Sequence, residues 1–443
     1  MRYIPLTLSD RKQMLQDIGV ESTQDLFSSI PSRCRFEGQP ALPSKKNESQ
    51  LISYFSELAD QNQSKFKGWS SYLGAGAYQH FIPSVVDLLS SRGEFATAYT
   101  PYQPEISQGT LQAIFEFQSM IAALYGMEVS NASMYDGASS LAEAVLMAGR
   151  IRKQRNVYIS QAVHPEYIDV VRSYTGDVDL ELIMLPVGND GRTQIENVDL
   201  EQAAAVVFAQ PNFFGVIEDL TVCKKFGDVV TIVANTDPLA FGLLQEPGAF
   251  DVDIVVGEGQ SLGNPLHFGG PHVGLLCSKK KYLRQLPGRL VGKSIDEDGR
   301  EAYVLTLSTR EQHIRRQKAT SNICTNHSLI ALRSAIYMAC MGRNGVMALA
   351  RKNYERAHTL CEKLLHIPGV KQKYASDFFH EFVLELPTPT STFLANMEKQ
   401  NILAGIDLST WNAQSDREIL ICATEVKSDQ DLDLYVNAFR GAL

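Results

Sequence analysis

Five short apolar runs, each bounded by polar or turn-forming residues, alternate with helical patterns in the middle of the chain. They are residues 157–159, 205–208, 229–233, 252–256 and 273–276. Compact runs without polar alternation are typical of strands that are buried on both faces. Strands that alternate with helices form a mostly parallel sheet that helices cover on both sides. The sequence therefore predicts an α/β fold.

The regions on either side of this central part differ from it. The N-terminal region is predicted to be a helical arm, because Ser9 and Asp10 can cap a helix before Met14 and Gly19 can end it. After the central part come helical patterns at 329–341 and 346–365, then apolar runs at 382–386 and 419–422, each followed by a helical pattern. This order is typical of a small α+β domain. The predicted domains are an N-terminal helical arm at 1–65, a large α/β domain at 66–328 and a small C-terminal α+β domain at 329–443.

The balance of charges restricts the classes of ligand. The net charge is −9, whereas surfaces that bind nucleic acid or membranes usually have an excess of positive charge. We therefore expect no nucleic acid and no membrane among the partners. Because no apolar stretch has the length of a signal peptide or a membrane helix, the expected compartment is the cytoplasm. The seven cysteines lack the spacing of zinc sites or disulfide frameworks, so no metal site is expected.

Ligands of open parallel sheets bind beyond the carboxyl ends of the strands, and four places there are candidates. The first is the turn formed by Asp136, Gly137, Ala138 and Ser139, directly before a predicted helix. Small residues at a helix N-terminus direct backbone N–H groups and the positive end of the helix dipole toward one point, which suits a phosphate. Aspartate and serine are also ordinary helix caps, and this alternative stays open.

The other three places follow predicted strands. His164 follows the run at 157–159, although a single histidine more often packs or hydrogen-bonds within the protein. Asp237 follows the run at 229–233, although Asp-Pro also starts turns. The fourth place is the loop that contains Gln260, which precedes a Gly-Gly-Pro segment. Its glycines can also serve tight backbone turns.

Together these places resemble the cofactor site of the fold type I PLP-dependent enzymes. In that family, a Gly/Ser turn at a helix N-terminus holds the cofactor phosphate, an aromatic residue or histidine stacks on the pyridine ring, and an aspartate pairs with the pyridinium nitrogen. Gln260 stands where the family has the lysine that forms the Schiff base, and no lysine lies between Lys225 and Lys279. Because glutamine has no nucleophilic amine, we predict no catalytic residue in this chain. What remains is a predicted vestigial site, formed by Asp136, Gly137, Ala138, Ser139, His164, Asp237 and Gln260.

Longer stretches resemble the glycine decarboxylase family, the P-proteins of the glycine cleavage system. They are SYLGAGAYQHFIP at 71–83, the segment at 99–144, FGGPHVG at 268–274 and REQHIRRQKATSNICTN at 310–326. The resemblance runs over essentially the whole chain. In this family, two related halves form one long chain or two separate subunits, and the first half lacks the PLP lysine. The resemblance therefore implies a fold type I PLP transferase-like fold and accounts for the glutamine at position 260.

The resemblance also implies a reaction and partners. A PLP-bearing glycine decarboxylase subunit 2 would decarboxylate glycine and release CO2, and the aminomethyl group would pass to the lipoyl arm of the H-protein. The T-protein and lipoamide dehydrogenase would complete the cycle. We thus expect PLP in the complex, bound by the partner subunit rather than by this chain, and we expect this chain to be inactive alone.

A loop of one subunit commonly reaches the cofactor phosphate of the other in fold type I dimers. Thr320, Asn322 and Thr325 resemble such a loop, because they offer hydroxyl and amide groups before a helix predicted at 323–341. Simple capping of that helix is the alternative. The alternative functions are a self-sufficient PLP enzyme, such as an aminotransferase or cysteine lyase, and a purely structural partner. Neither explains both the long matching segments and the missing amine.

Overall fold

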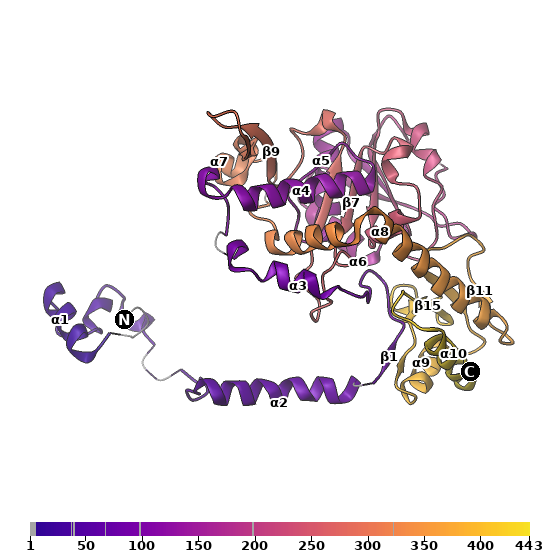
Figure 1. The fold of residues 1–443 in the computed structure, drawn as a ribbon, viewed down its shortest axis with the longest axis horizontal. Coiled ribbons are helices and arrows are strands. Elements are labelled where there is room, and N and C mark those ends of the chain that lie inside the picture. The colour runs from indigo at the N-terminus through magenta and orange to yellow at the C-terminus, as the bar shows by residue number, and fades with distance from the viewer. Residues whose placement is uncertain are drawn as a thin grey trace. The chain divides into compact units, whose positions relative to one another are not determined.

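Figure 1 shows the computed structural model, which describes residues 6–36, 38, 40–66, 68–96, 99–196, 199–321 and 323–443, with the backbone alone at 63–66. The chain forms two compact units, Met1–Lys67 and Gly68–Leu443. The predicted division at residue 328 lies within the second unit and stays a prediction. Among the described residues, no helix is both long and apolar enough to cross a membrane.

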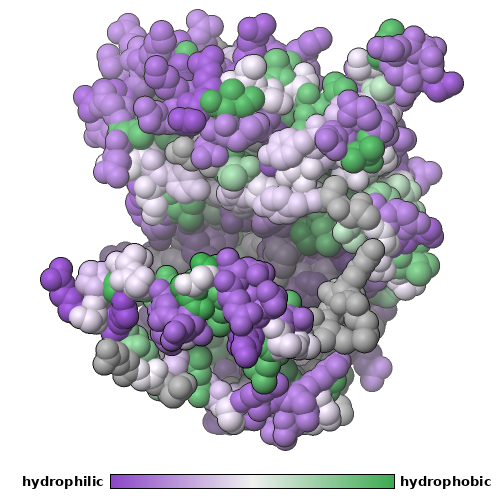
Figure 2. All heavy atoms as spheres, turned by 90° about the vertical axis from the view of Figure 1, so that its left-hand side faces the viewer, coloured by the Kyte–Doolittle hydropathy of each residue, from purple (hydrophilic) through white to green (hydrophobic). Residues whose placement is uncertain are grey.

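The first unit contains two α-helices, α1 (Leu8–Ile18) and α2 (Glu48–Phe66). Helix α1 ends at Gly19, as predicted, and the φ of that glycine is 79°. The predicted N-cap was wrong, because Thr7 caps the helix and Asp10 completes the capping box. No described residue between positions 6 and 62 is buried. Apolar side chains of this unit are therefore exposed, and on the face drawn in Figure 2 apolar side chains lie among hydrophilic ones.

A seven-stranded sheet lies at the centre of the second unit, with the strand order β2-β8-β7-β6-β5-β3-β4. The strands are β2 (Val129–Ser130), β3 (Asn156–Ser160), β4 (Glu181–Leu185), β5 (Ala203–Ala209), β6 (Val230–Asn235), β7 (Ile254–Glu258) and β8 (Gly274–Ser278). The strands from β7 to β4 are parallel, whereas β8 and β2 run antiparallel to their neighbours. The predicted α/β fold with a mostly parallel sheet is confirmed.

Alternate residues of the central strands contribute to two hydrophobic clusters. Val206 and Phe208 of β5 lie in one cluster, with residues of α4 (Gln108–Tyr125) and α8 (Ser328–Leu365). Ala205 and Val207 lie in the other, with residues of α5 (Gly137–Arg152) and α6 (Pro165–Thr175). Helices therefore cover both faces of the sheet, as Figure 1 shows, which explains why its strands are apolar without alternation.

Helix α8 bends at Gly342, whose φ is 58° and ψ is 176°. The parts of α8 before and after this bend correspond to the two helices predicted at 329–341 and 346–365. A four-stranded antiparallel sheet follows, with the order β11-β12-β15-β14. Its strands are β11 (Lys371–Gln372), β12 (Glu381–Glu385), β14 (Ile406–Asp407) and β15 (Glu418–Cys422), and its helices are α9 (Thr390–Glu398) and α10 (Asp429–Ala442). The two predicted strands at 382–386 and 419–422 are therefore present as β12 and β15. Outside both sheets, β1 (Ser70–Ser71) pairs in parallel with β13 (Ile402–Leu403).

Other parts of the structure also differ from the sequence-based prediction. The helix expected from residue 323 begins only at Ser328, because the preceding backbone makes tertiary contacts instead: the Cys324 N–H donates to the Tyr135 hydroxyl, and the Asn326 side chain donates to the carbonyl of Ala132. The hairpin of β9 (Leu290–Ile295) and β10 (Glu301–Thr306) was not predicted.

Candidate functional site

The predicted site residues lie beyond the carboxyl ends of three parallel strands. His164 follows β3, Asp237 follows β6, and Gln260 follows β7. The segment 75–80 brings them together, because it contacts each of them. These contacts join Ala75 to His164, Tyr78 to Gln260 and His80 to Asp237. A single short segment therefore fills the space between the strand ends.

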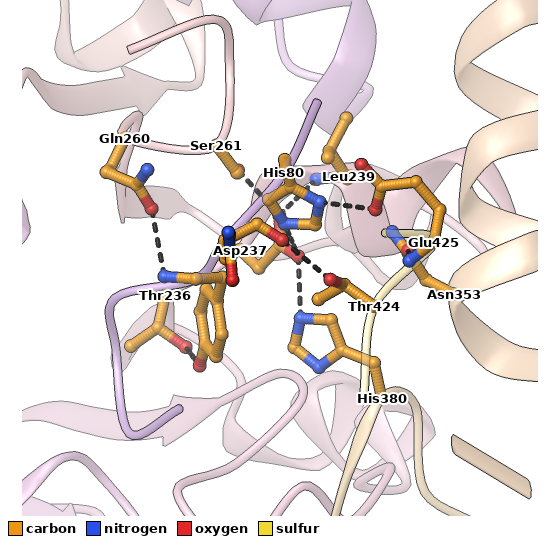
Figure 3. Close-up of polar contacts among 12 residues, drawn as sticks. His80, Thr236, Asp237, Leu239, Gln260, Ser261, Asn353, His380, Thr424 and Glu425 are labelled. Atoms are coloured by element: carbon orange, nitrogen blue, oxygen red, sulfur yellow. Dashed lines mark hydrogen bonds and ion pairs between the residues drawn. The ribbon is translucent and has the colours of Figure 1, made fainter. Parts of the chain in front are cut away.

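Asp237 lies at the centre of a buried polar cluster, which Figure 3 shows. Its Oδ1 accepts hydrogen bonds from the Ser261 hydroxyl at 2.6 Å and from the Leu239 N–H at 3.0 Å. Its Oδ2 accepts one from Nε2 of His380 at 2.7 Å, and Nε2 of His80 lies 3.5 Å from the same oxygen. Burial opposes ionisation, but the two histidines outweigh it and hold the pKa of Asp237 well below its ordinary value.

His80 lies between two carboxylates, Asp237 and Glu425 (Figure 3). Its Nδ1 is 2.8 Å from Oε2 of Glu425, and its side chain is 2% exposed. Burial alone would lower the pKa of His80, but the two carboxylates raise it to about 9. The ring is therefore a cation at neutral pH, with a proton on each nitrogen. Ligand atoms of His80, Asp237 and His380 lie within 4.8 Å of one another, a spacing that a metal ion could use, and Nε2 of both histidines already faces Oδ2 of Asp237.

Gln260 is buried, and both polar atoms of its amide are hydrogen-bonded. Its Oε1 accepts from the Tyr78 N–H at 3.0 Å, and its Nε2 donates to the carbonyl of Asn264 at 2.8 Å. The residue thus links the segment 71–83 to the turn that follows β7. A neutral amide that is hydrogen-bonded through both its oxygen and its nitrogen thus occupies the position where the resemblance would place a lysine.

Tyr78 and Glu381 extend this network toward β12. The Tyr78 hydroxyl donates to Oε2 of Glu381 at 2.7 Å and lies 2.9 Å from the Thr236 hydroxyl. The other oxygen of Glu381 accepts from the Ala75 N–H at 2.6 Å. Burial raises the pKa of both Tyr78 and Glu381. Close approach requires glycine here, because a Cβ at Gly74 would lie 2.0 Å from Oε1 of Glu381.

His164 caps helix α6 and is covered by the chain itself. Its Nδ1 accepts from the Glu166 N–H at 3.2 Å, and its Nε2 donates to the carbonyl of Ala75 at 2.9 Å. Burial lowers the pKa of His164, so the ring is neutral, and these two bonds assign its proton to Nε2. The Gly76 backbone lies against the ring, because a Cβ there would be 3.0 Å from Cδ2 of His164.

The turn at Asp136 caps helix α5, which is the alternative that the sequence left open. Oδ1 of Asp136 accepts from the Ser139 N–H at 2.7 Å, within a capping box. The Gly137 N–H donates instead to Oε2 of Glu258 at 3.0 Å, and Oε1 of Glu258 accepts from the Val273 N–H at 3.2 Å. Burial outweighs these bonds and raises the pKa of Glu258 to about 8. Ala138 packs beside the hydrophobic cluster under this helix.

Thr320 and Thr325, predicted to reach a partner, lie on the half-buried segment before α8. The Thr325 hydroxyl accepts from Nη1 of Arg289 at 3.3 Å. The capping alternative is wrong for both threonines, because the N-cap of α8 is His327. Asn322 lies outside the described residues.

A cleft of about 620 Å³ lies beside the start of α8. Its wall includes Asn326 and His327 together with the apolar side chains of Tyr99 and Ile114. The vestigial-site residues do not line it. Near it, the loop at 267–270 has positive φ at each residue, from 44° at His267 to 130° at Gly270, and the Phe268 side chain within it is fully exposed.

Four residues of the site were not predicted from the sequence. His80, His380 and Glu425 come from separate segments, and no local pattern connects them to Asp237. Glu258 is the last residue of β7, two residues before Gln260, and an acidic side chain is not expected beside a turn that suits an anion. The signal that was available is the glycine-rich segment 71–83, whose glycines allow the close approach described above.

Comparisons with known proteins agree on one family. The family model for the glycine cleavage system P-protein matches residues 1–439. The probable glycine dehydrogenase (decarboxylating) subunit 1 of Moorella thermoacetica is 44% identical, over 100% of both chains. Its counterpart from Oceanobacillus iheyensis is 45% identical over 98% of both chains.

Solved structures give the same answer. The crystal structure of a glycine decarboxylase (P-protein) of the glycine cleavage system, in inhibitor-bound form, matches with a TM-score of 0.92 and 42% identity over 100% of both chains. A sphingosine-1-phosphate lyase of Burkholderia pseudomallei, 13% identical, matches with a TM-score of 0.68 over 93% of this chain and 94% of its own, which shows the shared fold alone. The chain has the fold of the fold type I PLP-dependent enzymes, and it belongs to the glycine cleavage system P-protein family.

Proposed function

We propose that this chain is subunit 1 of a two-chain glycine decarboxylase, in which a second subunit binds PLP and this chain supports it. The observation that carries the proposal is Gln260, a buried and hydrogen-bonded neutral residue in a chain that the family model matches over residues 1–439. In the complex, glycine would lose its carboxyl group as CO2, and the aminomethyl group would pass to the lipoyl arm of the H-protein. The T-protein and lipoamide dehydrogenase would act as further members of the system.

The arrangement of the vestigial site supports the assignment of PLP to the partner. Both oxygens of Asp237 already accept hydrogen bonds, and the backbone of Gly76 lies against the His164 ring. The Gly137 N–H is already bonded to Glu258. As arranged here, these residues do not fit PLP, and no step of the reaction is assigned to them. This also counts against a self-sufficient PLP enzyme.

Exposed features of the second unit support a partner subunit. Phe268 is fully exposed in a loop of consecutive positive φ angles, a conformation that non-glycine residues rarely adopt. The cleft beside Asn326 and His327 lies next to the segment that holds Thr325. The exposed side chains of Tyr99 and Leu329 also line this cleft, and contiguous exposed apolar surface is typical of interaction sites. We propose that this surface faces subunit 2.

Neither chain alone is expected to catalyse glycine–bicarbonate exchange with lipoylated H-protein, whereas the co-expressed pair should do so. The measurement is the incorporation of labelled bicarbonate into glycine by each chain and by the purified complex. A complex that contains subunit 2 without its PLP lysine is the control and should be inactive. Exchange by this chain alone would overturn the proposed division of labour.

Thr325→Ala is expected to weaken PLP binding by the complex by about ten- to a hundredfold, because a hydrogen bond to a charged group contributes about 1.5–3 kcal/mol. The proposal is that the hydroxyl of Thr325, with Thr320 and Asn322 on the same segment, reaches the phosphate of the partner's cofactor. The measurement is a PLP titration of the complex after removal of the cofactor. Thr221→Ala, on an exposed turn of the second unit, is the control. Unchanged PLP affinity in Thr325→Ala would exclude this residue.

A further inference from the structure

The N-terminus of α5 presents backbone N–H groups that would attract an anion, yet a side chain of the same protein fills this position. Oε2 of Glu258 accepts from the Gly137 N–H at 3.0 Å, and its Oε1 accepts from the Val273 N–H at 3.2 Å. Glu258 is 4% exposed. Helix α5 has 16 residues, so its dipole is fully developed at this end. A carboxyl group therefore stands where a helix of this kind would hold a phosphate.

The second observation is independent and concerns the other end of the vestigial site. Nε2 of His80 has no hydrogen-bond partner of good geometry, although its side chain is 2% exposed, and it points at Asp237 from 3.5 Å. Nδ1 of the same ring is held by Glu425 at 2.8 Å. A ring with a proton on both nitrogens therefore presents a positive charge to the buried carboxylate.

We propose that Glu258 and His80 take, from within the chain, the places of the two polar ends of the missing cofactor. The carboxyl group of Glu258 occupies the anion position at α5, and the ring of His80 occupies the cation position beside Asp237. This inference rests on the proposed function, because it assumes that the site once held PLP. It goes further by naming the groups whose removal reopens the site.

The segment between these two ends supports the same inference. Gly76 lies against the His164 ring, and a Cβ on it would also lie 3.8 Å from Cγ2 of Thr236. Its backbone thus lies between the His164 ring and Thr236, which directly follows β6. Charge and shape are both provided by the chain, and the fold needs no ligand in order to satisfy Asp237.

Glu258→Ala is expected to create a site for inorganic phosphate, with an affinity at least about tenfold higher than that of the unmodified chain. The measurement is a calorimetric titration of the full-length protein with inorganic phosphate, against sodium chloride of equal ionic strength. The matched control is Glu143→Ala, which removes another buried carboxyl group of the α5 region that accepts no helix N-terminal N–H. A phosphate affinity of Glu258→Ala equal to that of Glu143→Ala overturns the proposal.

If Glu258→Ala does not fold in buffer alone, refolding yield replaces the titration. A yield that rises with phosphate and not with chloride supports the proposal, whereas a yield that phosphate leaves unchanged overturns it. The unmodified chain keeps its place in the complex in either case. The exchange assay with subunit 2 therefore tests the proposed function separately from this inference.

His80→Ala tests the other end. Added imidazole is expected to raise the unfolding temperature of this variant, because an imidazolium ion can enter the vacated space beside Asp237. His366→Ala is the control, since His366 is exposed and bonds only to the Glu362 carbonyl. An equal response of the two variants to imidazole would contradict the role assigned to His80.

Discussion

Replacing Asp237 by alanine is expected to lower the free energy of unfolding by about 3–5 kcal/mol, the effect of removing one partner from a buried ion pair. The substitution leaves His80 and His380 facing each other without the carboxylate that both contact. It also leaves the Ser261 hydroxyl and the Leu239 N–H without an acceptor. Unfolding by urea, followed by circular dichroism, measures the change.

Asp169→Ala is the control for this prediction. Asp169 forms an ion pair with Arg172 at 2.7 Å, but the two side chains are 68% and 55% exposed. Exposed pairs contribute about 0–1 kcal/mol, so this variant should keep nearly the full stability. Equal losses in the two variants would show that the buried cluster contributes no more than a surface pair.

The pH dependence of the free energy of unfolding distinguishes the contribution of the ion pair from that of side-chain packing. The pKa of His80 is raised from its ordinary value of 6.5 to about 9. The stabilisation from its positive charge is therefore fully present below about pH 6.5 and is lost as the pH rises through about 9. The stability difference between the unmodified chain and Asp237→Ala should shrink over this range. A difference that stays constant would indicate that lost packing, not lost charge, causes the effect.

The sheet could be predicted from the sequence because its signal is local. All seven residues of β5 are buried, so the strand is a continuous apolar run that no helix cap or polar alternation interrupts. Strand β4, at the opposite edge from β2, has exposed and half-buried residues, and its run was not recognised. Asp237 and Gln260 could be located from the sequence for the same reason, because each lies shortly after an apolar run. Asp237 follows β6, and Gln260 follows β7.

The polar cluster could not be predicted in the same way, since its signal is tertiary. Asp237 and His380 are separated by 143 residues, and only the packing of β12 near the end of β6 brings them together. Glu258 shows a second reason. The turn at Asp136 suits an anion, and this led to the expectation of a phosphate, but a carboxyl group two residues before Gln260 can satisfy the same N–H. A sequence pattern indicates what a site attracts, not whether the chain itself supplies it.

The cluster also connects parts of the second unit that are distant in sequence. His80 belongs to the segment after β1, Asp237 follows β6 of the large sheet, and Glu425 follows β15 of the small sheet. An enzyme of this fold could use its cofactor for such a connection, because the cofactor contacts several strand ends at once. We infer that the ion pairs of His80 preserve the connection in a chain that has no lysine to bind one.

Gln260→Lys is therefore expected not to restore PLP binding, although it returns the missing amine. A lysine cannot accept the hydrogen bond that the Tyr78 N–H now donates to Gln260, and burial at this position would penalise its ammonium group. We expect a loss of about 2–4 kcal/mol in the free energy of unfolding. With PLP present, no aldimine absorbance that borohydride removes should appear.

Gln260→Met separates the two effects expected for Gln260→Lys, the loss of a hydrogen-bond acceptor and the burial of a charge. Methionine has a similar length and also lacks an acceptor for the Tyr78 N–H, but it brings no charge, so it should be less destabilising than lysine.

The combination of Gln260→Lys with Glu258→Ala adds the change that the lysine alone lacks, because it vacates the anion position at the N-terminus of α5. If Gln260→Lys alone formed the aldimine, the site would be closed by the missing amine and not by the residues that now fill it. If only the double variant forms it, the occupied anion position is the barrier, and the loss of the lysine was followed by a change that keeps the site from reopening.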